Sequence, residues 1–194
     1  MINWKVIVGS AVLASVVALT GCQPTGTTSP APTENTNLAP TFDPENAKEF
    51  GIRGAHVGEG IKEAMAALKP EKYEFMDMIS RESLTVEQLA KGEGNITTGI
   101  LFADQAQVLV TVQKGVVTSI MVGGIPQEQG DKFKTNRGLS MYESIDKVKQ
   151  LYGDAAGDKE LTYKELTYKG SKYQVTFSLN NNKVIGYRFD VLAK

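Results

Sequence analysis

The thiol of Cys22 is the one group in this protein of 194 residues whose chemistry the sequence predicts. No second cysteine is present to form a disulfide with it, and exported domains of this size use cysteines in pairs or not at all. Cys22 closely follows the apolar run Val6–Leu19, which itself follows the positive charge of Lys5. That run is shorter than the roughly 20 residues a membrane-spanning helix needs, so residues 1–21 are predicted to be a cleaved export signal. We therefore expect Cys22 to be a modification site.

The residues that lead to Cys22 form a motif known from a protein family. Leu19, Thr20, Gly21 and Cys22 resemble the lipobox of bacterial lipoproteins, with a large apolar residue three positions before the cysteine and small residues between them. The resemblance implies diacylglycerol on the Cys22 thiol, cleavage before Cys22, and further acylation such as palmitate. Two or three acyl chains hold a small domain firmly at a membrane. The expected location is the outer face of the cell membrane, or an outer membrane if the bacterium has two, because Gln23 permits that transfer.

Other reactive groups are sparse. A metal site needs clustered ligands, and His56 is the only histidine, so no metal site and no cofactor are predicted. His56 is expected in a turn before the first helix. A serine triad has no support, because His56 is the only possible histidine base and no Gly-x-Ser-x-Gly motif is present. Asp77 and Glu82 are available as a carboxylate pair, but acids are common on any surface. The sequence therefore predicts no catalytic residue, and an envelope hydrolase is the weakest interpretation.

A segment rich in tyrosine and lysine is a candidate binding surface. Leu161-Thr162-Tyr163-Lys164-Glu165 is nearly repeated as Leu166-Thr167-Tyr168-Lys169-Gly170, and Lys172 follows. Tyrosines interleaved with lysines suit an anionic cell-wall polymer, a glycan or a protein partner. The favoured alternative is an edge strand protected by lysines with its tyrosines packed over it. The candidate surface consists of Tyr163, Lys164, Tyr168, Lys169 and Lys172.

Residues 22–45 are predicted to be a lipidated cysteine followed by a disordered tether. Proline, threonine, serine and asparagine dominate this segment, which includes Pro24, Pro30, Pro32, Pro40 and Pro44. Such a composition buries too little apolar surface to offset the entropy of ordering. An extended, solvated spacer is therefore expected.

Beyond residue 45 the hydrophobic pattern predicts an α+β fold. Helices are expected at Glu59–Lys69, Thr85–Lys91 and Met141–Tyr152, the last with Ser140 and Glu143 spaced as a capping box. Antiparallel strands are expected at Tyr73–Ile79, Gly99–Phe102, Val108–Val112, Val116–Gly123, Leu161–Tyr168, Tyr173–Leu179 and Val184–Val191. A hydrophobic fraction of 41% and a net charge of -1 are ordinary for a globular protein and do not favour nucleic acid as a partner.

The order of elements predicts two tandem units, 46–128 and 129–194, whose helices cover one face of the sheet. Glu59-Gly60-Ile61 aligns with Glu143-Ser144-Ile145, and Val110-Thr111-Val112 aligns with Val175-Thr176-Phe177. Val117 and Ile120 align with Val184 and Tyr187. The alternative is one irregular α+β domain. Whether the units share one sheet is left open.

This pattern resembles the tandem repeats of β-lactamase-inhibitor-like domains, of small outer-membrane-assembly lipoproteins and of the domain that precedes CAP domains. Leu139–Gly153 and Tyr173–Phe189 contribute most of the resemblance. It implies protein binding on the concave face of the sheet, with no cofactor. We therefore expect a surface-anchored, non-enzymatic module that binds an envelope protein, in an inhibitory or assembly role. A module that binds wall polymer or glycan is the alternative.

Overall fold

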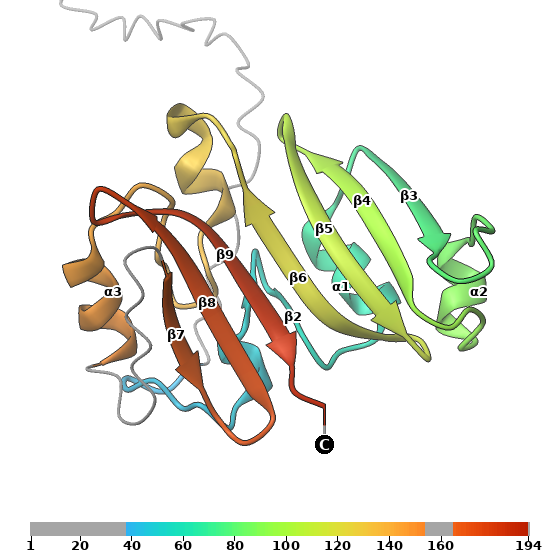
Figure 1. The fold of residues 1–194 in the computed structure, drawn as a ribbon, viewed down its shortest axis with the longest axis horizontal. Coiled ribbons are helices and arrows are strands. Elements are labelled where there is room, and N and C mark those ends of the chain that lie inside the picture. Colours follow the sequence, from blue (N-terminus) through green and yellow to red (C-terminus); the bar gives the residue numbers. More distant parts are fainter. Residues whose placement is uncertain (1–37, 154–164, 194) are drawn as a thin grey trace, which may run out of the picture.

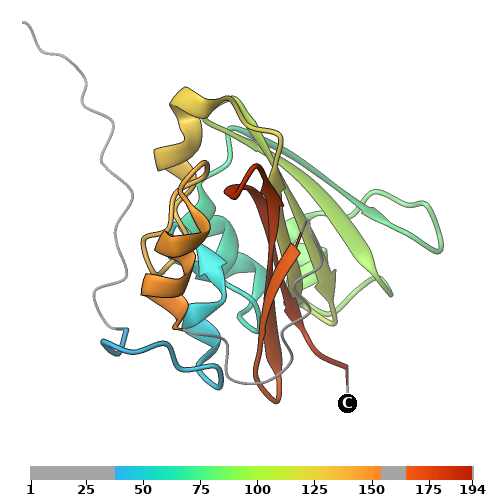
Figure 2. The same cartoon turned by 60° about the vertical axis from the view of Figure 1, so that its left-hand side comes forward.

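The computed structural model describes residues 38–153 and 165–193, and it has one large antiparallel sheet with helices on one face (Figures 1 and 2). The strand order is β3-β4-β5-β6-β9-β8-β7, and β1 and β2 form a separate two-stranded sheet. The predicted α+β class is therefore confirmed. The strands of the large sheet are β3 (Lys72–Asp77), β4 (Thr97–Ala103), β5 (Ala106–Gln113), β6 (Val116–Gly123), β7 (Glu165–Lys169), β8 (Tyr173–Asn180) and β9 (Lys183–Val191).

The elements outside the large sheet are short. The α-helices are α1 (Ile61–Leu68), α2 (Val86–Ala90) and α3 (Ile145–Tyr152); the 3-10 helices are η1 (Ala47–Glu49) and η2 (Gln127–Phe133); the small sheet is β1 (Gly51–Ile52) and β2 (Ala55–His56). The helix α2 begins with a capping box, since the Thr85 side chain accepts the amide of Gln88 and the Gln88 side chain accepts that of Thr85. This pairing satisfies two amides that the first turn of a helix leaves free.

The helix α3 begins later than predicted. Its N-cap is Ser144, whose side chain accepts the amide of Lys147, whereas Ser140 was expected to cap a helix from Met141. Tyr142 explains the difference, because its φ of 66° is left-handed and interrupts any helix there. The Ser140 amide does donate to Glu143 at 2.6 Å, but the Ser140 hydroxyl donates to Asp131.

Both halves contribute to the same sheet through the antiparallel pairing of β6 with β9. Side chains from both halves also form one buried apolar cluster. The strands β4-β5-β6 and β7-β8-β9 are two meanders, and each has a register shift at the same place, between Thr111 and Val112 and between Ser178 and Leu179. The predicted boundary at 128/129 therefore separates two meanders of one sheet.

Matched backbone contacts join each helix to its meander. Gly60 bridges to Val116, and Ser144 bridges to Lys183. The amides of Ile61 and Ile145 donate to Gly115 and Asn182, and the amides of Val117 and Val184 donate to Glu59 and Glu143. The contacts and register shifts align Val110 with Phe177, two residues beyond the Val175 expected from the sequence. Because a strand repeats every two residues, a slip of two keeps every side chain on the same face and leaves the sequence pattern unchanged.

Residues 39–45, which the sequence analysis assigned to the tether, are packed against the rest of the protein. Residues 39–45 lie against the second meander and α3, with the Phe42 ring 5.0 Å from Tyr152 and 5.9 Å from Tyr168. Arg137 donates to the carbonyls of Ala39 and Pro40. The packed part of the chain therefore begins before residue 45. Residues 46–57, assigned from the sequence to the first unit, likewise contact the second, as the bridge from Ile52 to Thr135 shows.

Candidate binding face

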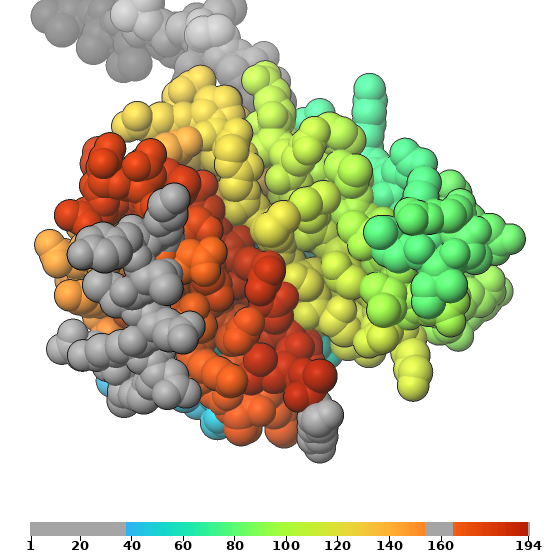
Figure 3. Space-filling model, in the orientation of Figure 1, coloured from blue at the N-terminus to red at the C-terminus, as the bar shows by residue number. Residues whose placement is uncertain are grey.

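The strand registers place three rows of side chains on the face of the sheet that the helices leave open. The middle of these, which we call the central row, crosses six strands and consists of Ile100, Leu109, Met121, Arg188, Thr176 and Thr167. It is apolar on β4, β5 and β6 and polar on β9, β8 and β7. The central row therefore changes from apolar to polar at the seam where the two meanders meet, which Figure 3 shows as the junction of yellow and red atoms.

The row beside it contains an ordered polar network centred on Asp190. The Asp190 carboxylate accepts bonds from the Ser119 hydroxyl at 2.8 Å, the Gln174 amide at 3.2 Å and Nε of Arg188 at 2.8 Å. These donors come from β6, β8 and β9. The network fixes the orientation of Arg188, whose side chain remains 52% exposed.

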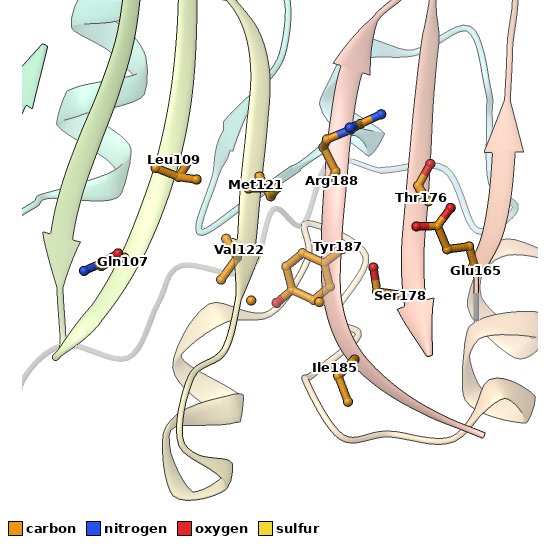
Figure 4. Close-up of a pocket in the computed structure, with 12 residues that line it drawn as sticks. Gln107, Leu109, Met121, Val122, Glu165, Thr176, Ser178, Ile185, Tyr187 and Arg188 are labelled. Carbon is orange, nitrogen blue, oxygen red and sulfur yellow. The ribbon is translucent and has the colours of Figure 1, made fainter. Parts of the chain in front are cut away.

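On the other side of the central row the open face is hollowed. Gly123 of β6 pairs with Gly186 of β9, so no side chain rises from the seam at this point. The hollow has a volume of about 490 Å³, and Figure 4 shows Met121 and Arg188 on one side of it and Ile185 on the other. Gln107, Ser178 and Glu165 lie further out in its lining.

Large apolar side chains are unusually exposed on this face. The exposed fractions are 41% for Ile100, 40% for Phe102 and 40% for Met121. Their neighbours one position along each strand, such as Leu101 and Val122, are buried against the helices. A solvated sheet face normally has polar residues at these positions, and contiguous exposed apolar surface marks interaction sites.

The described part of the tyrosine–lysine segment agrees with the favoured alternative, an edge strand with exposed lysines and a packed tyrosine. Tyr168 is 4% exposed, lies among Phe42, Tyr152 and Phe177, and donates to the Gly153 carbonyl at 3.1 Å. Lys169 and Lys172 are exposed, at the end of edge strand β7 and in the turn after it. Tyr168 is therefore not available at a surface, because its ring fills the core beneath β7. Tyr163 and Lys164 lie outside the described residues, as do Leu19, Thr20, Gly21 and Cys22.

The other candidates for chemistry have structural contacts. His56 ends β2, where its ring Nε2 lies 3.4 Å from Glu59 and its backbone amide donates to the same carboxylate at 2.8 Å. Burial raises the pKa of Glu59, and the bond from His56 opposes that rise. No group of His, Cys, Asp and Glu side chains within 38–153 and 165–193 is arranged to hold a metal ion.

Asp77, a candidate for a carboxylate pair with Glu82, instead binds backbone amides. Its carboxylate accepts the amides of Ser80, Asn95 and Ile79. These bonds lower its pKa to about 2. The side chain is 1% exposed, so it closes the loop between β3 and α2.

The open-face residues were missed by the sequence analysis. A usable signal is present in β4, β5 and β6, where Ile100, Phe102, Leu109 and Met121 occupy positions that alternate with buried residues. Arg188 and Asp190 have no comparable signal, because their meeting with Met121 and Ser119 depends on the pairing of β6 with β9.

No protein-family model and no curated protein matches the chain. Among solved structures, a cysteine-rich secretory protein from Staphylococcus aureus is similar at 13% identity and a TM-score of 0.44, over 79% of this chain and 50% of that one. An extracellular protein with an SCP domain from Bacillus anthracis is similar at 12% identity and a TM-score of 0.36, over 79% of this chain and 49% of that one. The chain thus spans about half the length of either structure. Separately, no helix among the described residues has the length and apolar character needed to cross a membrane.

Proposed function

We propose that this protein is a lipid-anchored module of the cell envelope that binds another protein through the open face of its sheet and has no catalytic activity of its own. The observation that supports this proposal is the exposure of Ile100, Phe102 and Met121 on a rigid sheet, beside the ordered network at Asp190. Protein interfaces combine apolar, well-packed centres with polar rims in this way. The anchoring part of the proposal rests on the lipobox at Leu19–Cys22.

The binding face is tested by crosslinking in intact cells. The full chain would be compared with the double variant Ile100→Ser, Phe102→Ser, and crosslinked proteins would be quantified by mass spectrometry. We expect at least one envelope protein to be crosslinked to the unchanged chain and its yield to fall roughly tenfold in the double variant, as a loss of about 1.4 kcal/mol of binding implies.

The control is Ile79→Ser, which removes an apolar side chain that is 68% exposed from the loop between β3 and α2 and not from the open face. Equal crosslinking yields from the double variant and the unchanged chain would contradict the proposed face. An equal loss of crosslinking yield in the control variant would show that the effect is not specific to the open face.

The anchor is tested by Cys22→Ser. Without the thiol no acyl chain is attached, so we expect the variant to leave the membrane fraction while its circular dichroism spectrum remains that of the folded domain. A variant that stays in the membrane fraction would refute anchoring through Cys22.

Binding of a wall polymer is the second interpretation. Lys169 and Lys172 are the described lysines that would contact an anionic polymer. This interpretation is less favoured because the Tyr168 ring is committed to the core. Sedimentation of the full chain with purified cell wall tests it. Binding that is lost on Lys169→Ala and Lys172→Ala would favour the polymer over the protein partner.

A further inference from the structure

We propose that the hollow at the seam of β6 and β9 receives one aromatic side chain of the protein partner. This inference rests on the proposed function, because it names the chemistry of the partner at the same face. It follows from the floor, the walls and the rim of the hollow, which each favour a flat ring over other side chains.

The floor of the hollow is backbone. Gly123 and Gly186 face each other across the seam, and the adjacent Val122 and Tyr187 direct their side chains into the core, where each is 1% exposed. A ring laid against this floor approaches the peptide groups directly, as glycine permits and other residues do not. A bulkier, branched side chain would make poorer contact with a flat surface.

One wall of the hollow presents a group that attracts aromatic rings. Met121 supplies a thioether, and sulfur contacts with ring edges are favourable by about 0.3–1.5 kcal/mol. Arg188 also lines the hollow, but its Nε donates to Asp190 at 2.8 Å. Figure 4 shows the guanidinium directed away from Ile185, so only the aliphatic stem of Arg188 faces the hollow. The Met121 thioether is therefore the wall group that favours a ring over an aliphatic side chain.

The rim excludes an acidic anchor and accepts a polar ring substituent. Glu165 lies in the lining, and Asp190 neutralises Arg188, so a carboxylate entering the hollow would meet no net positive charge. Gln107 and Ser178, also in the lining, offer hydrogen-bond partners for a tyrosine hydroxyl or an indole N–H. Buried tyrosine and tryptophan anchors of this kind dominate the binding energy of many protein interfaces.

The test uses Gly123→Val, which fills the hollow without straining the fold. A methyl group placed on Gly123 would lie 3.7 Å from the Ile185 carbonyl oxygen and 3.8 Å from Cα of Gly186, both ordinary contacts. Valine also suits a strand better than glycine does. The variant is therefore expected to be at least as stable as the unchanged chain, which denaturation would establish. The control is Thr111→Val, on the same face of β5 but outside the lining of the hollow.

The probes are the capped amino-acid amides N-acetyl-tryptophanamide, N-acetyl-tyrosinamide and N-acetyl-leucinamide, added to the isotope-labelled full chain in detergent micelles. We expect the two aromatic probes to shift the NMR signals of Gly123, Gly186 and the Met121 methyl group. The leucine probe should bind roughly tenfold more weakly. Gly123→Val should abolish the shifts at Gly186 and Met121, and Thr111→Val should leave them unchanged.

Three results would overturn the inference: no shift with any aromatic probe, equal binding of the leucine probe, or unchanged binding by Gly123→Val. The same variant in the crosslinking experiment separates the two proposals. If the partner is lost from the Ile100→Ser, Phe102→Ser variant but kept by Gly123→Val, the proposed function stands and the aromatic anchor falls. If neither variant loses the partner, both fall.

Discussion

At the scale of single residues, buried polar groups in this protein differ in whether their hydrogen-bonding capacity is used. Asp77 accepts three backbone amides and thereby closes the loop after β3. Tyr152 donates its hydroxyl to Thr135 at 3.0 Å. The Tyr187 hydroxyl, which is equally buried, has no partner among the described residues. Replacing these side chains is therefore expected to change the free energy of unfolding in different directions.

Asp77 should make stability depend on pH in the acid range. Because its pKa is lowered from 3.8 to about 2 in the folded state, the ionised carboxylate stabilises the fold fully above about pH 4, and this contribution is lost as the pH falls toward 2. Asp77→Asn should be less stable at neutral pH and should vary less in stability across that window. Urea denaturation at a series of pH values measures both effects.

Glu82→Gln, in the same loop, is the control for that measurement, because the contact it makes to Asp77 is through its backbone carbonyl. A pH dependence of Asp77→Asn that matches the unchanged chain between pH 4 and 2 would show that the three amides do not hold the carboxylate as described.

The two buried tyrosines form a matched pair for a second prediction. Tyr187→Phe removes a hydroxyl that has no described partner, so the free energy of unfolding should stay the same or rise. Tyr152→Phe removes a made hydrogen bond and should lower the free energy of unfolding by about 1 kcal/mol. Chemical denaturation compares them directly. A larger loss for Tyr187→Phe than for Tyr152→Phe would reverse the prediction.

At the scale of elements, one arginine joins residues 39–49 to the end of α3. Nη1 of Arg137 lies 2.7 and 2.8 Å from the two carboxylate oxygens of Glu49, and its Nε donates to the Leu151 carbonyl at the end of α3. The guanidinium also lies over the Phe42 ring at 5.9 Å. Burial raises the pKa of Glu49, and the bonds from Arg137 oppose this.

Breaking that pair should be costly, because it leaves one buried charge without its partner. The side chains are 7% and 0% exposed, so Arg137→Met should lower the free energy of unfolding by about 3–5 kcal/mol. It should also free residues 39–45 for cleavage by added protease. Adding Glu49→Met should recover part of the loss, since the orphaned charge is then removed.

Lys132→Met serves as the control at the element scale. Lys132 is 47% exposed and lies 3.5 Å from Asp104, and exposed pairs contribute about 1 kcal/mol at most. If Arg137→Met were no more destabilising than Lys132→Met, the buried pair could not be what secures the segment.

At the scale of the whole molecule, the two halves share a core and an internal strand pairing. One cluster of buried residues includes Phe50 and Val110 from the first half and Phe177 and Phe189 from the second. Separating the halves would expose the paired edges of β6 and β9 as well as this apolar surface. Neither half is therefore expected to be stable alone.

The corresponding prediction concerns cooperativity. The chain should unfold in one transition. Circular dichroism and tyrosine fluorescence should report the same midpoint denaturant concentration. Fragments 38–128 and 129–194 should show no cooperative transition when produced separately. Two resolved transitions in the intact chain, or a folded fragment, would contradict the shared core.

Much of the local structure was predictable from residues close together in the sequence. The strand Val116–Gly123 was predicted with its observed ends. The hairpin turns after β5 and β8 contain Gly115 and Asn181-Asn182, residue types that tolerate the positive φ found there. The start of α3 was predicted wrongly because the left-handed Tyr142 has no sequence signal. Its amide is bonded to Val184, far along the chain.

The sequence by itself determined most of the strands and turns, because these depend on side-chain alternation or on residue types within a few positions; the export motif at Cys22 stays a prediction. Only the tertiary structure decided that β6 pairs with β9 and that residues 39–45 pack on the second half. The physical reason is that a strand edge offers the same backbone donors and acceptors to any other strand. The hollow between Gly123 and Gly186 depends on that choice of partner, and so does the face proposed to bind.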